Sequence, residues 1–276
     1  MGDSPQVGAV DWTGRRCEME IGPVAHGGHC VGRVDGRVVF VRHALPGERV
    51  VVEITEDRGG SFCRGDAVEV LDASPARVTP ACPLAGPGGC GGCDWQHASP
   101  AAQRELKSQV IGEQLRRLAG LRWTVPVEEL PGGPLHWRTR LRLAVDDRGH
   151  AGLRSHRGHE VIRLDPEEGC AIAAHGLLDG VLNRSWSAGG VEVVLDDRGA
   201  QHVATREPVT RSRGFRTRWL VGGRAEQSAA GRAWSLSADG FWQVHPAAAD
   251  TLASVVGDWA DAPTGGVAWD LYGGAG

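Results

Sequence analysis

Three cysteines stand close together in a stretch that has almost nothing apolar to bury: Cys82, Cys90 and Cys93, with the spacing C-x7-C-x2-C. The residues between them are mostly glycine and proline. Because such a segment cannot hold its shape through core packing, we expect a metal centre to hold it, with thiolates converging on one ion or cluster. Tetrahedral sites need four ligands, and we predict the distant Cys170 as the fourth.

The spacing of the cysteines leaves the kind of metal open. Structural zinc usually takes two close pairs of cysteines, whereas this chain offers one pair, one nearby cysteine and one remote cysteine. Three clustered thiolates and a distant fourth suit an iron–sulfur cluster at least as well. Disulfides and idle thiols are the plain alternatives, and the odd count of seven cysteines without a secretory segment disfavours disulfides.

Length and composition indicate a multidomain protein of the cytoplasm. A chain of 276 residues has room for two or three domains. The N-terminus carries charged residues in place of an apolar run, which argues against a signal peptide, and no stretch approaches the length of a membrane span. Because the net charge is −4, the chain as a whole is not a basic nucleic-acid coat, and contact with nucleic acid requires local clusters of arginine.

The N-terminal part of the sequence reads as a series of short strands. Val50, Val52 and Ile54 share one face, and the next candidate strand repeats the alternation at Val68 and Val70. Several short strands at close spacing are typical of a small closed barrel. We therefore predict a small N-terminal β-barrel.

A helix is predicted directly after the cysteine stretch. Ser99 is a good capping residue, Pro100 favours the first helical position, and Gly120 favours the end of the helix. Apolar residues recur along one stripe of this helix, and we expect the stripe to face the core: Leu106, Val110, Ile111, Leu115 and Leu118.

From about residue 136 to residue 240 the pattern changes to strands that are joined by hairpin turns. Two of these turns share the sequence DDRG, at Asp146–Gly149 and at Asp196–Gly199. A helix from about Ile172 to Asn183 is predicted between them. The sum is an α+β central domain.

Arginines of the central domain gather in two clusters. Arginines on the polar face of a strand can contact phosphates while the other face packs inward, and nearby aromatic side chains offer stacking surfaces for unpaired bases. A solvated strand face is the plain alternative for any single arginine. We predict RNA contact for the two clusters together, which are Arg138, Arg140, Arg142, Arg154 and Arg157, then Arg211, Arg213, Arg216 and Arg218.

The C-terminal part carries a second strong signal. Phe241–Pro246 reads FWQVHP and leads into a helix, and a buried strand is then predicted over Val267–Tyr272. The strand runs into the glycine loop Gly273–Gly276. A glycine loop after a first strand lets a ligand approach the backbone closely, as dinucleotide sites and methyltransferases both require.

Two stretches bear family resemblances that add to this interpretation. Gly27–Val34, followed by the Leu-Pro-Gly-Glu turn at Leu45–Glu48, resembles the TRAM domain, a small RNA-binding barrel of the OB-like kind. With the four cysteines, FWQVHP and DLYGGAG in the same order, nearly the whole chain resembles the S-adenosylmethionine-dependent RNA (uracil-C5-)methyltransferases, in the iron–sulfur branch that acts on ribosomal RNA.

The resemblance implies a set of ligands and functional residues. It implies a [4Fe–4S] cluster on Cys82, Cys90, Cys93 and Cys170, and a structural role for that cluster. It also implies that a Rossmann-like α/β methyltransferase domain begins in this sequence, and that Phe241 lies near a flipped uracil. His245 stands where many relatives have Asn, so no role is carried over to it. The residues implied to lie near S-adenosylmethionine are Gln243, Asp270, Tyr272, Gly274 and Gly276.

The predicted domains follow in chain order. They are a TRAM-like RNA-binding β-barrel at 1–75, the cysteine-rich iron–sulfur loop at 76–98, a helix with an α+β central RNA-binding domain at 99–240, and the beginning of the methyltransferase domain at 241–276.

The catalytic residues of the family lie in later motifs. A cysteine thiolate adds to C6 of uracil, and a general base removes the C5 proton. Because both belong C-terminal to the glycine loop that ends this sequence, we name no catalytic residue and expect an N-terminal fragment that is inactive alone. The expected partner is RNA, ribosomal RNA above all, with no membrane and no obligate protein partner.

Two other functions compete with this one. A non-enzymatic RNA-binding module with a structural zinc site explains the barrel, the cysteines and the arginines, but leaves DLYGGAG without a purpose. A radical enzyme that carries a TRAM domain would need C-x3-C-x2-C, a spacing that the sequence lacks.

Overall fold

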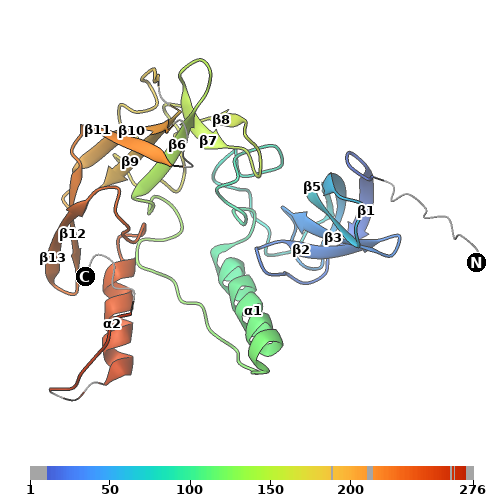
Figure 1. Ribbon diagram of the computed structural model, residues 1–276. Coiled ribbons are helices and arrows are strands. Elements are labelled where there is room, and N and C mark those ends of the chain that lie inside the picture. Colours follow the sequence, from blue (N-terminus) through green and yellow to red (C-terminus); the bar gives the residue numbers. More distant parts are fainter. Residues whose placement is uncertain (1–10, 188, 210–213, 262, 264, 272–276) are drawn as a thin grey trace, which may run out of the picture. The chain divides into compact units, whose positions relative to one another are not determined.

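The computed structural model describes residues 11–187, 189–209, 214–261, 263 and 265–271. The chain forms two compact units, Met1–Glu128 and Glu129–Gly276 (Figure 1). The domain boundaries that the sequence suggests at residues 75, 98 and 240 stay predictions. In the part of the chain that the structure describes, no helix is both long and apolar enough to cross a membrane.

A five-stranded sheet makes up much of the first unit. Its strands follow one another in space as β1-β4-β5-β3-β2, with β3 and β5 parallel and the other pairs antiparallel. Just beyond the end of β1, the N–H of Gly22 donates to the Val31 carbonyl on β2 at 2.8 Å, so the sheet curls around its core. A closed barrel stays a prediction, because the described parts of β1 and β2 form no ladder with each other. The strands are β1 (Arg16–Glu20), β2 (Cys30–Val34), β3 (Arg37–Arg42), β4 (Arg49–Asp57) and β5 (Phe62–Asp72).

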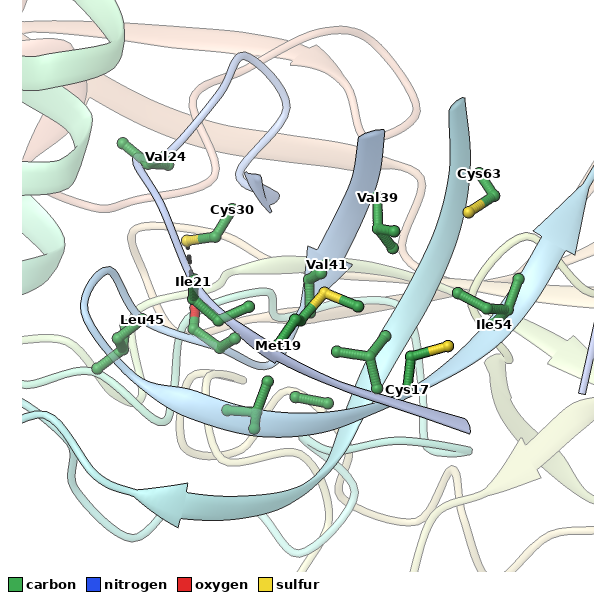
Figure 2. Packing of buried hydrophobic residues seen from close by; sticks show 14 of the residues in the cluster. Cys17, Met19, Ile21, Val24, Cys30, Val39, Val41, Leu45, Ile54 and Cys63 are labelled. Carbon is green, nitrogen blue, oxygen red and sulfur yellow. Dashed lines mark hydrogen bonds between the residues drawn. The ribbon is translucent and has the colours of Figure 1, made fainter. Parts of the chain in front are cut away.

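The inner face of this sheet is apolar and tightly packed. Val50, Val52 and Ile54 on β4 are fully buried, as predicted from their alternation. They pack against side chains from the other four strands, and Figure 2 shows Met19 and Val41 among them. The period-two pattern therefore located the buried face of β4 correctly.

The predicted alternation at Val68 and Val70 is wrong, because a β-bulge interrupts it at Val68. Val51 pairs with Glu69 and Val52 pairs with Ala67, so Val68 is an extra residue on β5 without a partner in the ladder. Its side chain is 38% exposed, whereas Ala67 is buried. An extra residue in one strand shifts every following side chain to the other face.

The Leu-Pro-Gly-Glu turn between β3 and β4 ends in a fully buried carboxylate. Arg77 donates two hydrogen bonds of 2.6 Å to Glu48, and its Nη2 also donates to the His43 carbonyl at 2.8 Å. The N–H groups of Leu45 and Ser74 donate to the same carboxylate at 2.8 and 3.0 Å. Burial alone would raise the pKa of Glu48, but these donors outweigh it and lower the pKa below its ordinary value.

Helix α1 (Pro100–Ala119) begins and ends where the sequence predicts. The Ser99 hydroxyl accepts a hydrogen bond from the N–H of Ala102 at 3.3 Å, and Gly120 closes the helix with φ of 68°. The predicted apolar stripe belongs to the core only at its N-terminal end. Leu106 is buried against the sheet of the first unit, whereas Leu118 is 83% exposed.

The described residues of the second unit form two antiparallel sheets and one helix, which Figure 1 labels. The larger sheet has the order β11-β10-β9-β6-β7-β8, and β12 pairs with β13 in a separate hairpin. The elements are β6 (Arg140–Val145), β7 (Ala151–Arg154), β8 (Val161–Arg163), β9 (Gly190–Leu195), β10 (Gln201–Pro208), β11 (Phe215–Val221), β12 (Arg224–Ala229), β13 (Arg232–Ser237) and α2 (Ala248–Ala260).

Both predicted DDRG turns are confirmed, and both use the same hydrogen bonds. In each turn the first aspartate accepts hydrogen bonds from the backbone N–H groups two and four residues later. Gly149 and Gly199 have φ of 85° and 75°, which glycine adopts without steric cost. Local side-chain chemistry thus fixes the hairpins β6–β7 and β9–β10.

The predicted helix from Ile172 to Asn183 is wrong. This segment forms a succession of turns, in which several N–H groups donate to the carbonyl three residues back. Gly176 and Gly180 have φ of 82° and 67°, a left-handed conformation that interrupts a right-handed helix. The turns nevertheless bury Leu177 and Val181 completely or nearly so.

The two faces of the six-stranded sheet differ in what they bury. One face is apolar over β6 and β9, and its buried residues are Leu141, Leu143, Val191 and Val193, with Val203 of β10 beside them. Toward β11 the same face carries Thr205, Arg216 and Arg218. On the opposite face, the β12–β13 hairpin covers one end, where Val194 packs with Ala225 and Ala238.

The predicted buried strand over Val267–Tyr272 is also wrong within the described residues, and Tyr272 lies outside them. Val267, Trp269 and Leu271 are between 71 and 87% exposed and have no strand conformation. A strand becomes regular only when a neighbour supplies its hydrogen bonds, and the described residues place no strand beside this segment.

We expect Glu48→Gln to destabilise the first unit by about 3 kcal/mol at pH 7, because it leaves Arg77 without its buried partner. The folded pKa of Glu48 is lowered. The ion pair therefore stabilises fully above the unfolded value of about 4.3 and loses its effect as the pH falls through the folded pKa. Urea unfolding followed by circular dichroism at neutral and acid pH measures both effects.

The matched control is Glu53→Gln, which removes an exposed carboxylate that pairs with Arg16 at 2.9 Å. Exposed pairs contribute less than about 1 kcal/mol. Equal losses for the two variants at pH 7, or a Glu48→Gln protein whose stability falls with acid as steeply as the wild type, would contradict this role of Glu48.

Candidate nucleic-acid interface and cysteine loop

The cysteine loop places three of the four predicted ligands on the first unit. Cys82 and Cys90 are buried, Cys93 is half-buried, and the half-buried Cys170 belongs to the second unit. Thiols are the donors that zinc and iron–sulfur centres prefer, so the donor types fit such a group. Among the residues that the structure describes, no three histidine, cysteine or acidic side chains are arranged as a metal-binding group.

The far end of the loop is fastened to the five-stranded sheet and its connections by side chains. Arg42, which is itself buried, pairs with Asp94 at 3.1 Å. Trp95 donates from its indole nitrogen to the Gly28 carbonyl at 2.8 Å, and its ring lies at van der Waals distance, 3.5 Å, from where a Cβ atom on Gly28 would be. The glycine-rich segment Gly27–Val34, which resembles the TRAM domain, therefore contacts the cysteine loop.

The two ends of the loop are also joined to each other. The N–H of Cys82 donates to the side-chain oxygen of Gln96 at 3.0 Å, and the N–H of Val78 donates to the His97 carbonyl at 2.9 Å. Between these contacts, the N–H of Cys90 donates to the Leu84 carbonyl at 3.1 Å. The predicted metal ligands therefore lie in a loop whose two ends are joined by the protein's own hydrogen bonds.

The three remaining cysteines belong to the core of the first unit. Cys17, Cys30 and Cys63 are at most 6% exposed (Figure 2). Burial raises the pKa of the Cys30 thiol to about 12 and also raises the pKa of Cys63. Buried thiols with raised pKa are poor nucleophiles, which disfavours a nucleophilic role for Cys30 and Cys63.

In the second unit, the residues just ahead of β6, His136–Thr139, join two distant segments, and we call them the strap. The N–H of His136 donates to the Ala171 carbonyl at 3.1 Å, and the N–H of Arg138 donates to the Ile172 carbonyl at 2.7 Å. On the other side, Thr139 donates from its N–H and from its hydroxyl to the Val244 carbonyl, at 2.9 and 3.0 Å. The segment beside Cys170 and the segment that contains Gln243 are therefore fixed to the same backbone.

Ring stacking reinforces both sides of the strap. His136 stacks on His175 with ring centres 4.2 Å apart, and Trp137 stacks on His245 with ring centres 5.7 Å apart. The His136 stack thus lies on the side of the Ala171 and Ile172 carbonyls, and the Trp137 stack lies on the side of the Val244 carbonyl. Sequence analysis gave His245 no role, and in the structure it closes the strap onto the FWQVHP segment.

The predicted cofactor residues are only partly described. Gln243 is half-buried beside the strap, whereas Asp270 is exposed. Tyr272, Gly274 and Gly276 lie outside the described residues. Phe241, predicted to stack on a flipped base, is 79% exposed.

The predicted RNA-binding arginines do not form one surface. Arg140 is turned inward, where its two Nη atoms donate to the carbonyls of Ala238 and Gly240. Burial lowers the pKa of Arg140, so its contacts favour a structural role. Arg138 donates from Nε to the Arg140 carbonyl at 3.1 Å, beside the strap.

The other predicted arginines lie at separate places on the sheet. Arg142 on β6 and Arg154 on β7 share one face, and Arg157 follows in the β7–β8 turn. Arg216 on β11 is opposite Glu207 and belongs to the other face, and Arg213 lies outside the described residues. The face of each arginine depends on strand register, which the arginine pattern alone did not supply.

Sequence reasoning missed Glu192 and Arg206. Glu192 is a buried carboxylate within an otherwise apolar strand, and it pairs with Arg142 at 3.1 Å and with Arg206 at 3.5 Å. A charged residue within the valine-rich run of β9 was the available signal, because a buried carboxylate needs a cationic partner.

Comparisons with known proteins agree with this architecture. Residues 13–68 match the TRAM domain. An uncharacterized RNA methyltransferase of Streptomyces avermitilis is 48% identical over 95% of this chain and 68% of the relative. The chain belongs to this RNA methyltransferase family. A second member, from Streptomyces coelicolor, is 44% identical over 97% of this chain and 65% of the relative, so the chain spans about two thirds of the length of these relatives.

Two further relatives of this RNA methyltransferase have more specific names. The 23S rRNA (uracil(1939)-C(5))-methyltransferase RlmD of Shewanella amazonensis is 35% identical over 59% of this chain and 37% of the relative. The solved tRNA (uracil-54, C5)-methyltransferase of Pyrococcus abyssi, in complex with S-adenosyl-L-homocysteine, has a TM-score of 0.60 over 87% of this chain and 64% of that chain. At 17% identity this second likeness establishes the fold alone.

We expect Thr139→Val to loosen the FWQVHP segment, because it removes one of the two hydrogen bonds from the strap to Val244. A lost hydrogen bond of about 1 kcal/mol corresponds to a roughly fivefold rise in local amide exchange. Hydrogen exchange followed by mass spectrometry on peptides covering 241–246 measures it. Thr139→Ser keeps the hydroxyl and should leave exchange near the wild-type rate; equal exchange in all three proteins would refute a positioning role for Thr139.

Proposed function

We propose that this RNA methyltransferase takes a methyl group from S-adenosylmethionine and transfers it to C5 of a uracil in RNA, ribosomal RNA above all. The observation that carries the proposal is the 35% identity with a 23S rRNA uracil-C5 methyltransferase, together with the TRAM domain at 13–68. The fold likeness to a second uracil-C5 methyltransferase supports the same class of reaction.

The exposed aromatic side chain next to the strap suits the handling of a base. An enzyme that acts on C5 inside a folded RNA has to extrude the target base from its stack, and stacking on an aromatic ring offsets part of that cost. Phe241 is 79% exposed, and its segment is fixed through Val244 and His245 to the strap. We assign the stacking role to Phe241, and a contact with the bound cofactor to the half-buried Gln243.

The glycine-rich motif completes the proposed cofactor site. Asp270, Tyr272, Gly274 and Gly276 all belong to the motif DLYGGAG. S-adenosylmethionine supplies the methyl group when it is bound. Glycines let its methionine part approach the backbone closely.

Deleting the gene from the cell that carries it tests the reaction and the substrate together. We expect one 5-methyluridine to disappear from ribosomal RNA, as measured by nucleoside mass spectrometry of separated rRNA and tRNA. Loss from tRNA instead would contradict the ribosomal substrate, and unchanged 5-methyluridine in both would contradict the function.

Complementation of the deletion assigns Phe241. The wild-type gene should restore the modification, and Phe241→Ala should restore it roughly tenfold more slowly, because a lost base–aromatic stack costs about 1–3 kcal/mol. Phe241→Tyr keeps the ring and serves as the matched control. Full restoration by Phe241→Ala would remove the stacking role.

We further propose that Cys82, Cys90, Cys93 and Cys170 hold a [4Fe–4S] cluster. The donor type and the fixed base of the cysteine loop support it. The role we assign is structural, because three of the four thiols belong to one short loop whose two ends are already joined by hydrogen bonds.

Anaerobic purification tests the cluster directly. We expect a brown protein that contains iron and acid-labile sulfide, and Cys170→Ser should lose most of both. Cys17→Ala is the matched control, because Cys17 lies in the core of the first unit and its loss should leave iron unchanged. A colourless protein with zinc would favour the zinc-stabilised RNA-binding module, and a Cys170→Ser protein with full iron would exclude Cys170 as a ligand.

A further inference from the structure

One face of the six-stranded sheet gathers cationic side chains that come from four different strands. Residues directly opposite each other in an antiparallel pair share a face. Arg142 is opposite Glu192, which is opposite Ala204, and Arg206 two residues further along β10 lies on the same side. By the same register Pro208 is opposite Phe215, and Gly152 is opposite Arg163. The resulting arginine face consists of Arg142, Arg154, Arg163, Glu192, Arg206 and Phe215.

Glu192 fixes the two central arginines in place. Its carboxylate is only 8% exposed and lies 3.1 Å from Nε of Arg142 and 3.5 Å from Nε of Arg206. Two cations around one carboxylate leave a net positive charge. The Arg142 side chain is 61% exposed, so it presents part of that charge to solvent. A cation that is already oriented loses less conformational entropy when it binds an anion.

Phe215 adds an aromatic surface at the edge of this charge. It is 54% exposed, and the guanidinium of Arg206 lies 4.6 Å from the centre of its ring. An exposed ring beside a fixed arginine is the combination on which unpaired bases stack while their phosphates meet the cation.

The open part of the arginine face is limited at one end by the β12–β13 hairpin. The hairpin packs on Val194. The turn that follows the hairpin accepts hydrogen bonds from both Nη atoms of Arg140 through two of its backbone carbonyls. Arg142, Arg206 and Phe215 lie away from this cover. The neighbouring arginines on β11 point to the other side, because Arg216 is opposite Glu207 and Arg218 is opposite Thr205.

We infer that the open part of the arginine face binds a single-stranded segment of RNA, with Arg142 and Arg206 on phosphates and Phe215 stacked on one base. The inference rests on the proposed function for the choice of RNA as the polyanion. Single strands fit better than duplex, because the bases of an A-form helix are stacked inside it and leave no free ring surface for Phe215.

Two double variants of the 276-residue chain test this face against its opposite. Fluorescence anisotropy with a labelled uridine-rich single-stranded RNA oligonucleotide, without cofactor, gives the affinity at several salt concentrations. We expect Arg142→Gln with Arg206→Gln to weaken binding at least tenfold. The slope of log affinity against log salt should fall by about 1.4, since each lost phosphate contact removes about 0.7. Arg216→Gln with Arg218→Gln removes the same charge from the opposite face. The sequence grouped these two arginines with the RNA-binding cluster, but their register places them away from the arginine face, so the affinity should change less than twofold.

Two more variants separate binding from folding and stacking from charge. A triple variant combines Arg142→Gln and Arg206→Gln with Glu192→Gln. Because the carboxylate is removed together with its two cationic partners, this protein should fold, and it should still bind RNA at least tenfold more weakly than the wild type. Phe215→Leu should weaken binding to the single strand roughly tenfold while leaving binding to the same sequence as a duplex unchanged.

Equal losses from the two double variants, a larger loss from the Arg216 and Arg218 variant, or a triple variant that is folded and binds normally would overturn the inference. These outcomes are distinct from failure of the proposed function, because the anisotropy measurement requires no methyl transfer. A gene deletion that removes 5-methyluridine, combined with arginine-face variants of normal affinity, would keep the reaction and reject this surface.

Discussion

The first unit depends on one buried ion pair, between Glu48 and Arg77. Glu48 belongs to the turn that joins β3 to β4, and Arg77 belongs to the linker that leads to the cysteine loop. The next residue of the linker, Val78, bonds to His97 at the other end of that loop. The pair therefore sets where the loop leaves the five-stranded sheet. The three cysteines of the loop then lie between ends that the fold already joins.

The strap gives the second unit a comparable junction, made of backbone. His136 and Arg138 bond to the segment beside Cys170, and Thr139 bonds to the segment of Gln243. The two segments are thus connected to each other through hydrogen bonds to the same four residues of the strap. Rigid connection of this kind is what a site needs when its groups must stay within a fraction of an ångström.

Features that depend on neighbouring residues in the chain were predictable, and features that depend on a partner strand were not. The cap at Ser99, the end at Gly120 and the two DDRG turns follow from local hydrogen bonds and backbone angles. The alternation predicted at Val68 and Val70 was wrong because a β-bulge is defined by the pairing of β5 with β4, which the sequence of β5 alone does not contain. For the same reason the arginines could be counted from the sequence but not assigned to faces, since register depends on which strands pair.

The charge of the chain illustrates why faces matter more than totals. A protein of net charge −4 repels a polyanion on average. It can still bind one where cations are gathered within a Debye length of about 8 Å and acidic groups are few. Glu192 is the exception on the arginine face, yet it is buried and lies between two arginines. Its single negative charge neutralises only one of the two arginines and orients both of them. This carboxylate in a valine-rich strand therefore fixes the positions of two arginines that come from different strands.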